Sequence, residues 1–286
     1  MGSLEQIDIE TQKDIETVAA FARDNGYSNL YKSLPDISPD FNTWFERIIP
    51  FDRKRLYSCK DQLSHFEDGE VRFLSSEFNP ARFEELFLIP QLIDTMWQSV
   101  SSLCRSVQPK VASLIVPPFW QMGPMFYHTC RKEKVPVSVM TPRNLPIARQ
   151  LIKEAEVDMV VTTASASREL HTLLLEEGLE RQIRTWHIVL TEDGNIEHIP
   201  IKEGISLEYF IFPGISFGKA DAELFSTGVL TVQPSDDFFV ELANGNCLVT
   251  SRKKTALPLI RFQIGGTWRI ESEKENAFFV RTDYGK

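Results

Sequence analysis

The stretch from Val111 to Gly178 alternates short apolar runs with segments of helical spacing, and this alternation constrains the fold more than any other feature of the sequence. Short apolar runs of this kind are typical of buried strands. The predicted elements, in chain order, are strand 112–117, helix 125–134, strand 135–140, helix 145–155, strand 157–163 and helix 167–178. Strands that alternate with helices of this length favour a parallel sheet with right-handed crossovers. Residues 108–183 are therefore predicted to form a parallel α/β unit.

The N-terminal part, residues 1–107, is predicted to be helical. Apolar residues repeat at helical spacing over 14–24, and Asn25-Gly26 is a typical signal for the end of a helix. A short amphipathic helix is predicted over 40–50, where a proline ends it.

A longer helix is predicted over about 80–107, with a kink or a break at Pro90. Its helical spacing gives one broad apolar face. The residues of that face are Phe83, Leu86, Ile89, Ile93, Met96 and Trp97.

Residues 184–286 are predicted to be rich in antiparallel strands. Asp193-Gly194 and Asn244-Gly245 each separate two β-type runs, and both pairs tolerate the positive φ angles of tight hairpin turns. Further strands are predicted over 258–264, 267–272 and 277–282. Because no clean linker separates these parts, residues 1–286 are interpreted as one domain with subdomains.

Composition narrows the classes of partner. With 42% hydrophobic and 11% aromatic residues, the chain can bury a sizeable core, and a net charge of -9 disfavours nucleic acid as the main partner. The basic cluster 252–254 is interpreted as a solvated loop. The N-terminus is too acidic for a signal peptide, and no apolar run reaches the ~20 residues that cross a bilayer. Scattered cysteines fit reduced thiols, so a cytoplasmic location without membrane partners is expected; they are Cys59, Cys104, Cys130 and Cys247.

Three local sequence matches, in the same order as the elements, carry a family resemblance. They cover 34–56 (L-P-D-I-S…F-N-T-W-F-E-R-I-I-P-F-D-R-K-R-L), 147–170 (I-A-R-Q-L-I-K-E-A-E-V-D-M-V-V-T-T-A-S-A-S-R-E-L) and 228–266 (G-V-L-T-V…D-D-F-F-V-E-L…A-L-P-L-I-R-F-Q-I-G-G). The chain resembles the phenylacetate–CoA ligase-like branch of the adenylate-forming (AMP-binding, acyl-CoA synthetase) superfamily. The resemblance implies an α/β fold like the large N-terminal domain of those enzymes. It also implies an acyl pocket lined by the helix–strand unit of 147–170.

The resemblance also shows which parts of the family's chemistry have changed. The family's flexible phosphate loop corresponds to a stretch that begins at Ser75 and Ser76 but continues with Glu77, which would bring negative charge beside phosphate. Counting back without gaps from the last match places Phe210 at the adenine-stacking tyrosine and Gly214 at the magnesium-binding glutamate. With a gap, Glu208 or Glu223 takes the glutamate's role.

The third motif of the family ends at Gly265 and Gly266. The family's arginine and aromatic residue are retained as Arg261 and Phe262, but Gly266 stands where an aspartate holds the ribose hydroxyls. Losing two charge-assisted hydrogen bonds would cost about 3 kcal/mol of nucleotide binding. The family's C-terminal lid, which carries the catalytic lysine, is expected to be absent.

Other residue patterns have simpler interpretations. His128 and Cys130 could begin a metal site, but a structural or surface role is favoured because no second pair has ligand spacing. His187 and His198 are interpreted as an exposed pair across a hairpin. The run T-T-A-S-A-S is interpreted as a helix start. The aromatic segments 44–51 and 117–127 are interpreted as core, and the second could also line an apolar pocket.

The favoured function is a non-catalytic homologue of adenylate-forming enzymes that binds a small acyl or aryl ligand between the α/β unit and the β-rich part. The pocket candidates are Trp120, Thr162, Thr163, Phe210, Phe212, Gly214 and Arg261. No metal and no cofactor is expected under this interpretation. Pairing in a homo-oligomer or with an active ligase is a further expectation. The alternative is one half of a split ligase, which would use ATP, Mg²⁺ and CoA with a lid from another chain; a third possibility is a structural scaffold.

Overall fold

In the computed structural model, the chain forms two compact units, and each unit is built from two separate segments of the sequence. Unit 1 contains residues 1–70 and 234–282, and unit 2 contains residues 71–233 and 283–286. The structure describes residues 7–24, 30–31, 34–58, 71–75, 84–88, 101–116, 122–191, 204–212, 215–220, 230–253, 258–273 and 276–281. Each unit is described by itself.

Unit 2 contains the predicted parallel sheet. Its strands are β3 (Ala112–Ile115), β4 (Val137–Met140), β5 (Met159–Thr163), β6 (Thr185–Thr191), β7 (Ile205–Phe212), β8 (Ile215–Ala220) and β9 (Leu230–Pro234), in the spatial order β9-β8-β7-β6-β5-β3-β4. Neighbouring strands from β4 to β7 pair in parallel, and β7 pairs antiparallel with β8. The parallel part thus continues through β6 and β7, beyond the segment 108–183 in which the sequence predicted it.

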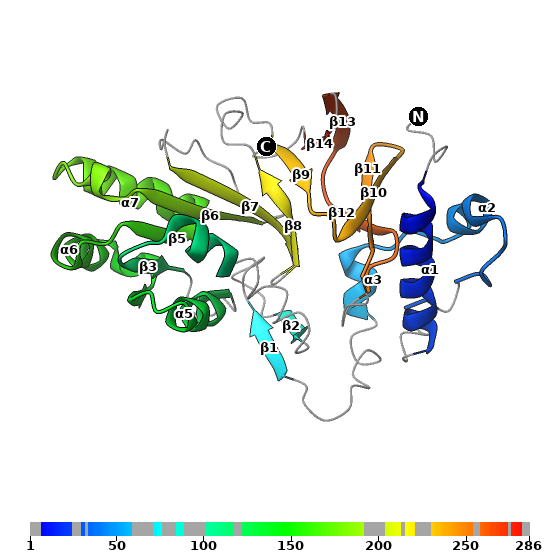
Figure 1. Cartoon of the computed structure of the whole chain (residues 1–286), viewed down its shortest axis with the longest axis horizontal. Coiled ribbons are helices and arrows are strands. Elements are labelled where there is room, and N and C mark those ends of the chain that lie inside the picture. The colour runs from blue at the N-terminus through cyan, green and yellow to red at the C-terminus, as the bar shows by residue number, and fades with distance from the viewer. Residues whose placement is uncertain are drawn as a thin grey trace. The chain divides into compact units, whose positions relative to one another are not determined.

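Helices cover both faces of this sheet. They are α5 (Met122–Lys132), α6 (Leu145–Ala155) and α7 (Ala164–Leu175), and Figure 1 shows them around the parallel strands. Phe126 of α5 contacts His187 of β6, whereas His171 of α7 contacts the neighbouring Trp186. Adjacent strand residues point to opposite faces, so α5 and α7 lie on opposite sides of the sheet. These helices confirm the predicted α/β unit.

The core of unit 2 lies between α5 and the strands. Its members come from the strands and their ends, from α5 and from the helix 101–107, and they are apolar side chains of different sizes. The buried cluster contains Cys104, Ala112, Leu114, Val116, Phe126, Cys130, Val135, Met159, Val161 and Val189.

The long helix predicted over 80–107 is wrong in part. Residues Glu84–Leu88 form strand β2, which pairs antiparallel with β1 (Val71–Ser75). Only 101–107 is helical among the described residues of that stretch. Pro90 disfavours helix in the residue before it, and pairing with β1 overrides the helical spacing of the apolar residues. The other predicted residues of the apolar face, and Pro90 itself, lie outside the described residues.

Unit 1 combines helices with antiparallel strands. Its elements are α1 (Ile9–Asp24), α2 (Phe41–Glu46), α3 (Arg53–Ser58), a three-stranded sheet of β10 (Phe238–Ala243), β11 (Asn246–Ser251) and β12 (Phe262–Ile264), and the hairpin of β13 (Trp268–Glu273) and β14 (Asn276–Arg281). Asn244 and Gly245 have φ angles of 53° and 79°, which confirms the predicted tight turn between β10 and β11. The turn at Asp193-Gly194 lies outside the described residues.

The short helix α2 begins and ends for identifiable reasons. Asp40 accepts a hydrogen bond from the backbone N–H of Thr43 at 3.3 Å, which caps the N-terminus. The helix ends at Glu46, earlier than the predicted proline. Phe41, Trp44 and Phe45 are buried and their rings contact one another. The aromatic side chains of segment 44–51 are all buried, which confirms their interpretation as core; they are Trp44, Phe45 and Phe51.

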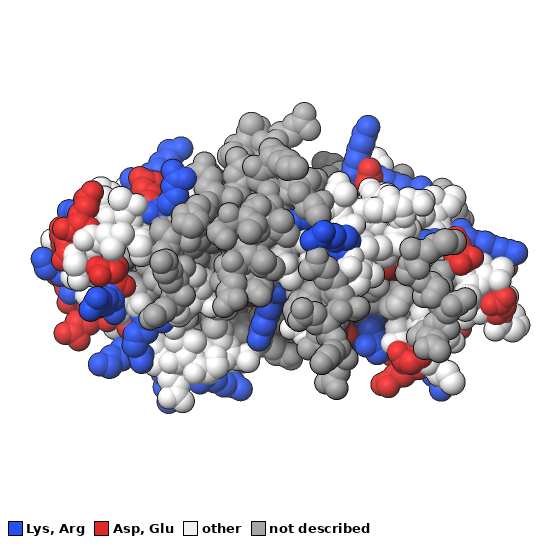
Figure 2. All heavy atoms as spheres, turned by 90° about the horizontal axis from the view of Figure 1, so that it is seen from above, with Lys and Arg blue, Asp and Glu red and all other residues white. Residues whose placement is uncertain are grey.

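Charged side chains of both signs are interspersed on the described surface that Figure 2 shows. The basic cluster is less free than predicted, because Arg252 pairs with Asp14 at 2.9 Å and Lys253 pairs with Asp237. Within the described part of the chain, no helix has the length and apolar character needed to cross a membrane.

Candidate ligand-binding edge of the parallel sheet

The parallel strands of unit 2 end at one common edge. β5, β6 and β7 run in the same direction and finish at Thr163, Thr191 and Phe212. In open α/β sheets, ligands bind outside the carboxyl ends of the strands. Four predicted pocket residues lie on the last residues of these strands, namely Thr162, Thr163, Phe210 and Phe212. The strand register places Thr163 level with Val189 of β6 and Glu208 of β7, so Phe210 and Phe212 lie farther along the same edge.

Thr162 and Thr163 have different roles at this edge. Thr162 is fully buried, and its hydroxyl donates to the backbone oxygen of Ile115 at 2.8 Å, so it joins β5 to β3. Thr163 is half-buried at the N-cap of α7 but makes no side-chain cap bond, and its Oγ1 lies 3.4 Å from Oγ of Ser165. The first backbone N–H groups of a helix favour acceptors and negative charge. Thr163, and not Thr162, is the residue suited to contact a carboxylate ligand.

The edge at β7 is irregular. Pairing between β7 and β8 shifts register between Tyr209 and Phe210, and again between Phe210 and Phe212. Such bulges re-aim side chains and are frequent next to binding sites. The sequence contains no signal for this irregularity, apart from the Pro-Gly pair that follows Phe212.

His187 does not fit its predicted exposed position. It is only 3% exposed; its Nδ1 lies 3.2 Å from Oγ of Ser206, and its Nε2 lies 3.3 Å from Oε2 of Glu208. The ring also contacts Phe126 of α5. The prediction of an exposed histidine pair is thus wrong for His187, because its strand position points into the α5 face. The continuous apolar run around His187, which is typical of a strand buried on both faces, could have indicated this burial.

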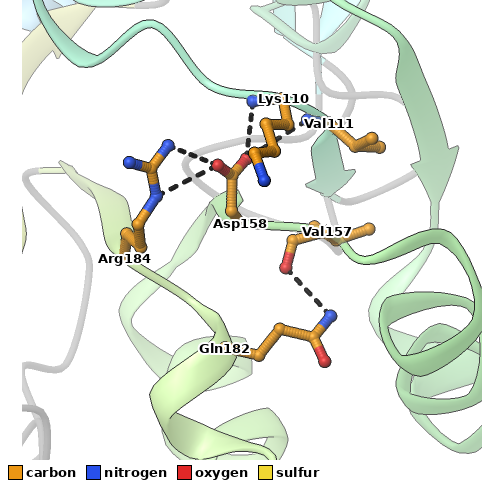
Figure 3. A network of polar contacts seen from close by, with 6 residues as sticks. All are labelled: Lys110, Val111, Val157, Asp158, Gln182 and Arg184. Atoms are coloured by element: carbon orange, nitrogen blue, oxygen red, sulfur yellow. Dashed lines mark hydrogen bonds and ion pairs between the residues drawn. The ribbon is translucent and has the colours of Figure 1, made fainter.

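The opposite edge of the sheet is built around Asp158, which is only 7% exposed. Its Oδ1 accepts the backbone N–H groups of Lys110 and Val111 at 2.9 and 3.2 Å, and its Oδ2 accepts Nε of Arg184 at 3.1 Å (Figure 3). Burial raises the pKa of Asp158, but these hydrogen bonds, that of Arg184 first, outweigh burial and hold the pKa below its usual value. Because it joins the starts of β3, β5 and β6, this network is structural.

The side chain of Arg261, the retained motif residue, makes its hydrogen bonds to residues of unit 1. Its guanidinium pairs with Oε1 of Glu241 through Nε at 2.6 Å, and its Nη1 donates to the backbone oxygens of Phe45, Glu46 and Ile48 at 3.3, 3.0 and 2.7 Å. The cation also lies over the ring of Phe45, 5.4 Å from its centroid. These oxygens belong to the C-terminal end of α2, where cations are favourable. The predicted role of Arg261 in a ligand pocket is therefore not supported by its contacts, which are structural.

At Gly266, where the resemblance implies an aspartate, a side chain would displace the end of the Arg281 side chain. The φ of Gly266, +97°, lies in the region that favours glycine, and a Cβ there would come within 2.8 Å of Cζ and 2.9 Å of Cδ of Arg281. The preceding Gly265 offers its backbone oxygen to Nε1 of Trp268 at 2.9 Å. An aspartate at this position would need both a different backbone and a displaced arginine.

Several predicted site residues lie outside the described residues. They are Trp120, Ser76, Glu77, Gly214, Glu223 and His198. Ser75 is the last residue of β1, and only its backbone is described.

Within the described ranges, no group of three or more His, Cys, Asp or Glu side chains could hold a metal ion. His128 is exposed whereas Cys130 is fully buried in the core. The two side chains therefore do not share a surface, in agreement with the structural or surface interpretation of this pair. The predicted start of a helix within T-T-A-S-A-S is confirmed, because α7 begins at Ala164 after Thr163.

No protein-family model and no curated protein matches the sequence. Solved structures do resemble it. Unliganded O-succinylbenzoate coenzyme A synthetase (MenE) from Bacillus subtilis matches with 13% identity and a TM-score of 0.49 over 76% of this chain and 50% of that chain. The amide bond synthetase McbA from Marinactinospora thermotolerans matches with 12% identity and a TM-score of 0.46 over 71% and 42%. An acyl-CoA synthetase (AMP-forming)/AMP-acid ligase II-like protein from Dyadobacter fermentans matches with 11% identity and a TM-score of 0.45 over 73% and 58%. The chain spans less than two thirds of each of these proteins.

Proposed function

We propose that the chain is a non-catalytic homologue of adenylate-forming enzymes, which binds a small acyl or aryl acid without activating it. The order of the three sequence matches supports the family assignment. Binding would use the carboxyl edge of the parallel sheet in unit 2. Pairing with a second copy or with an active ligase belongs to the same proposal, because a protein without its own chemistry can act through a partner.

The occupied space at Gly266 is the observation that carries the loss of catalysis. In the resembling family an aspartate at this position holds the nucleotide ribose, and here Arg281 fills the space that its side chain needs. The neighbouring motif residue Arg261 is bound to Glu241 and to the end of α2. Two positions of one nucleotide-binding motif thus serve the packing of unit 1 instead.

The edge of unit 2 supports retained acid binding. Thr163 and the N-terminal N–H groups of α7 provide hydrogen-bond donors, and two of the last three residues of β7 are phenylalanines. Such an edge suits a ligand with one carboxylate and an apolar body.

The test is calorimetric titration of the whole protein with a panel of acyl and aryl acids, each with and without Mg·ATP, and with CoA. We expect binding of at least one acid whose affinity does not depend on nucleotide. Affinity that requires ATP would overturn the proposal and favour a split ligase with its lid on another chain. If none of the acids binds, the proposal of acid binding is wrong and a structural scaffold is favoured.

A pair of threonine variants locates the binding site. Thr163→Val removes one donor at the edge and is expected to weaken acid binding about fivefold, the equivalent of one hydrogen bond of about 1 kcal/mol. Thr172→Val, which changes an exposed residue farther along α7, is the matched control and should leave the affinity unchanged. If the two substitutions weaken acid binding equally, the ligand does not bind at this edge of the sheet.

A pair of glycine variants tests the occupied space itself. Gly266→Ala and Gly245→Ala both place a side chain at positive φ, but a Cβ at Gly245 meets no atom within 4 Å. We expect Gly266→Ala to cost about 1 kcal/mol more in free energy of unfolding, because it displaces the end of the Arg281 side chain. Equal costs in urea titrations would show that Arg281 does not fill this space.

A further inference from the structure

Two buried cysteines of unit 2 are in direct contact. Cys104 lies on helix 101–107 and Cys130 lies on α5, and their Sγ atoms are 4.0 Å apart although the residues are 26 positions apart in the chain. Cys104 is 3% exposed and Cys130 is fully buried. The sequence predicted scattered, unrelated thiols, and the fold brings these two together.

Polar contacts beside the cysteines hold the two helices at this distance. Glu133, just after α5, accepts Nη2 of Arg105 at 3.0 Å and Nε of the same residue at 3.3 Å, and Ser101 donates its hydroxyl to the same carboxylate. Ser101 and Arg105 flank Cys104 on one helix, and Glu133 follows Cys130 by less than one turn. The thiols therefore meet in a fixed arrangement.

The two thiols are not equivalent. The hydrogen bond with Cys130 lowers the pKa of Cys104 below its ordinary value, against the opposing effects of burial and of Glu133. The same bond, followed by burial, raises the pKa of Cys130. Cys104 is 3% exposed whereas Cys130 is fully buried, so Cys104 is the thiol nearer to solvent, and Cys130 lies in sulfur contact with it and can react second.

We propose that Cys104 and Cys130 form a redox-active dithiol that closes to an intrachain disulfide when the protein meets a hydroperoxide. The sulfur of Cys104 attacks one peroxide oxygen, the O–O bond breaks, and a sulfenic acid and hydroxide form. The sulfur of Cys130 then attacks the sulfur of Cys104, which forms the S–S bond, breaks the S–O bond and releases the second hydroxide. The two thiol protons convert both hydroxides to water, so hydrogen peroxide gains two electrons and the thiols lose two. The sulfur atoms must approach from 4.0 Å to about 2 Å to form this bond.

The test treats the native, full-length protein with hydrogen peroxide, blocks the remaining thiols after denaturation, and maps the cysteines by mass spectrometry without reduction. We expect one cross-linked peptide pair that joins Cys104 to Cys130 and that disappears on reduction. Cys247 is the internal comparison: it is as buried as Cys130 and burial raises its pKa, but the sulfur contact among the described cysteines joins Cys104 to Cys130, so Cys247 should stay reduced. Retention of both thiols, or oxidation of Cys104 without the cross-link, would overturn the proposal.

Serine variants assign the order of the two steps. Cys130→Ser should accumulate a sulfenic acid at Cys104 that dimedone traps, whereas Cys104→Ser should leave Cys130 as a free thiol. Trapping at Cys130 in Cys104→Ser would contradict the assigned order. The cross-link in the unaltered protein does not depend on whether these variants fold.

Discussion

Two Arg–carboxylate pairs among the described residues, one in each unit, differ in which partner organises its surroundings. In unit 2 the carboxylate of Asp158 is the centre, since it accepts from Arg184 and from two backbone N–H groups, and Arg184 is 57% exposed. In unit 1 the guanidinium of Arg261 is the centre, since it donates to Glu241 and to three backbone oxygens, and the two side chains are only 9% and 11% exposed.

The pKa values follow this difference. The hydrogen bonds of Asp158 outweigh burial and lower its pKa. Burial dominates at Glu241 and raises its pKa, although Arg261 opposes it. An arginine thus favours the charged form of Asp158 in unit 2, whereas in unit 1 burial disfavours the charged form of Glu241 despite its arginine. An ion pair is therefore informative only together with the other hydrogen bonds of each partner.

The largest expected effect comes from Arg261→Ala. It leaves Glu241 buried without its cation and three backbone oxygens without their donor, so we expect a loss of about 3–5 kcal/mol in free energy of unfolding. Arg184→Ala is the matched control, because its side chain is mostly exposed, and should cost about 1 kcal/mol. Urea titrations give the free energies of unfolding of both variants. Equal losses would show that the two ion pairs do not differ in their contribution to stability.

An intermediate effect, dependent on pH, is expected from Asp158→Asn. Because the folded pKa of Asp158 is lowered, its contribution is fully present above the unfolded pKa of about 3.9 and is lost as pH falls through the lower folded value. The substitution should cost about 2 kcal/mol near neutral pH and flatten the acid side of the stability curve. Parallel acid profiles for the two proteins, measured by thermal unfolding, would contradict this account.

The smallest effect is expected from Glu241→Gln. The raised pKa of Glu241 means that its neutral form is relatively favoured in the fold; that contribution is present below the unfolded pKa and is lost as pH rises through the folded value. A neutral glutamine can still accept from Arg261, so we expect a cost near neutral pH of about 1 kcal/mol or less. If Glu241→Gln lowers the free energy of unfolding more than Asp158→Asn does, the charged carboxylate is more important in unit 1 than in unit 2, which contradicts this account.

Local patterns predicted the local elements well. The segment 145–155 coincides with α6, and Asn244-Gly245 forms the expected turn, because helical spacing and turn chemistry are properties of neighbouring residues. The pattern failed at Glu84–Leu88, where pairing with β1 decided the structure.

The candidate site was predictable only in part. Thr163 lies at the edge that the strand–helix alternation indicated. The role of Arg261 was not predictable, because its partners on α2 lie more than two hundred positions earlier in the chain. The occupied space at Gly266 likewise depends on Arg281, which only the hairpin of β13 and β14 brings close. Long-range contacts of this kind leave no local signal.

The most direct test of the proposed loss of catalysis is calorimetric titration of the full chain with Mg·ATP and with AMP. The packing of Arg261 and Arg281 in unit 1 predicts no measurable binding of either nucleotide. A Kd in the micromolar range or tighter, which corresponds to a binding free energy of about -8 kcal/mol or more favourable, would contradict the account and favour an active ligase.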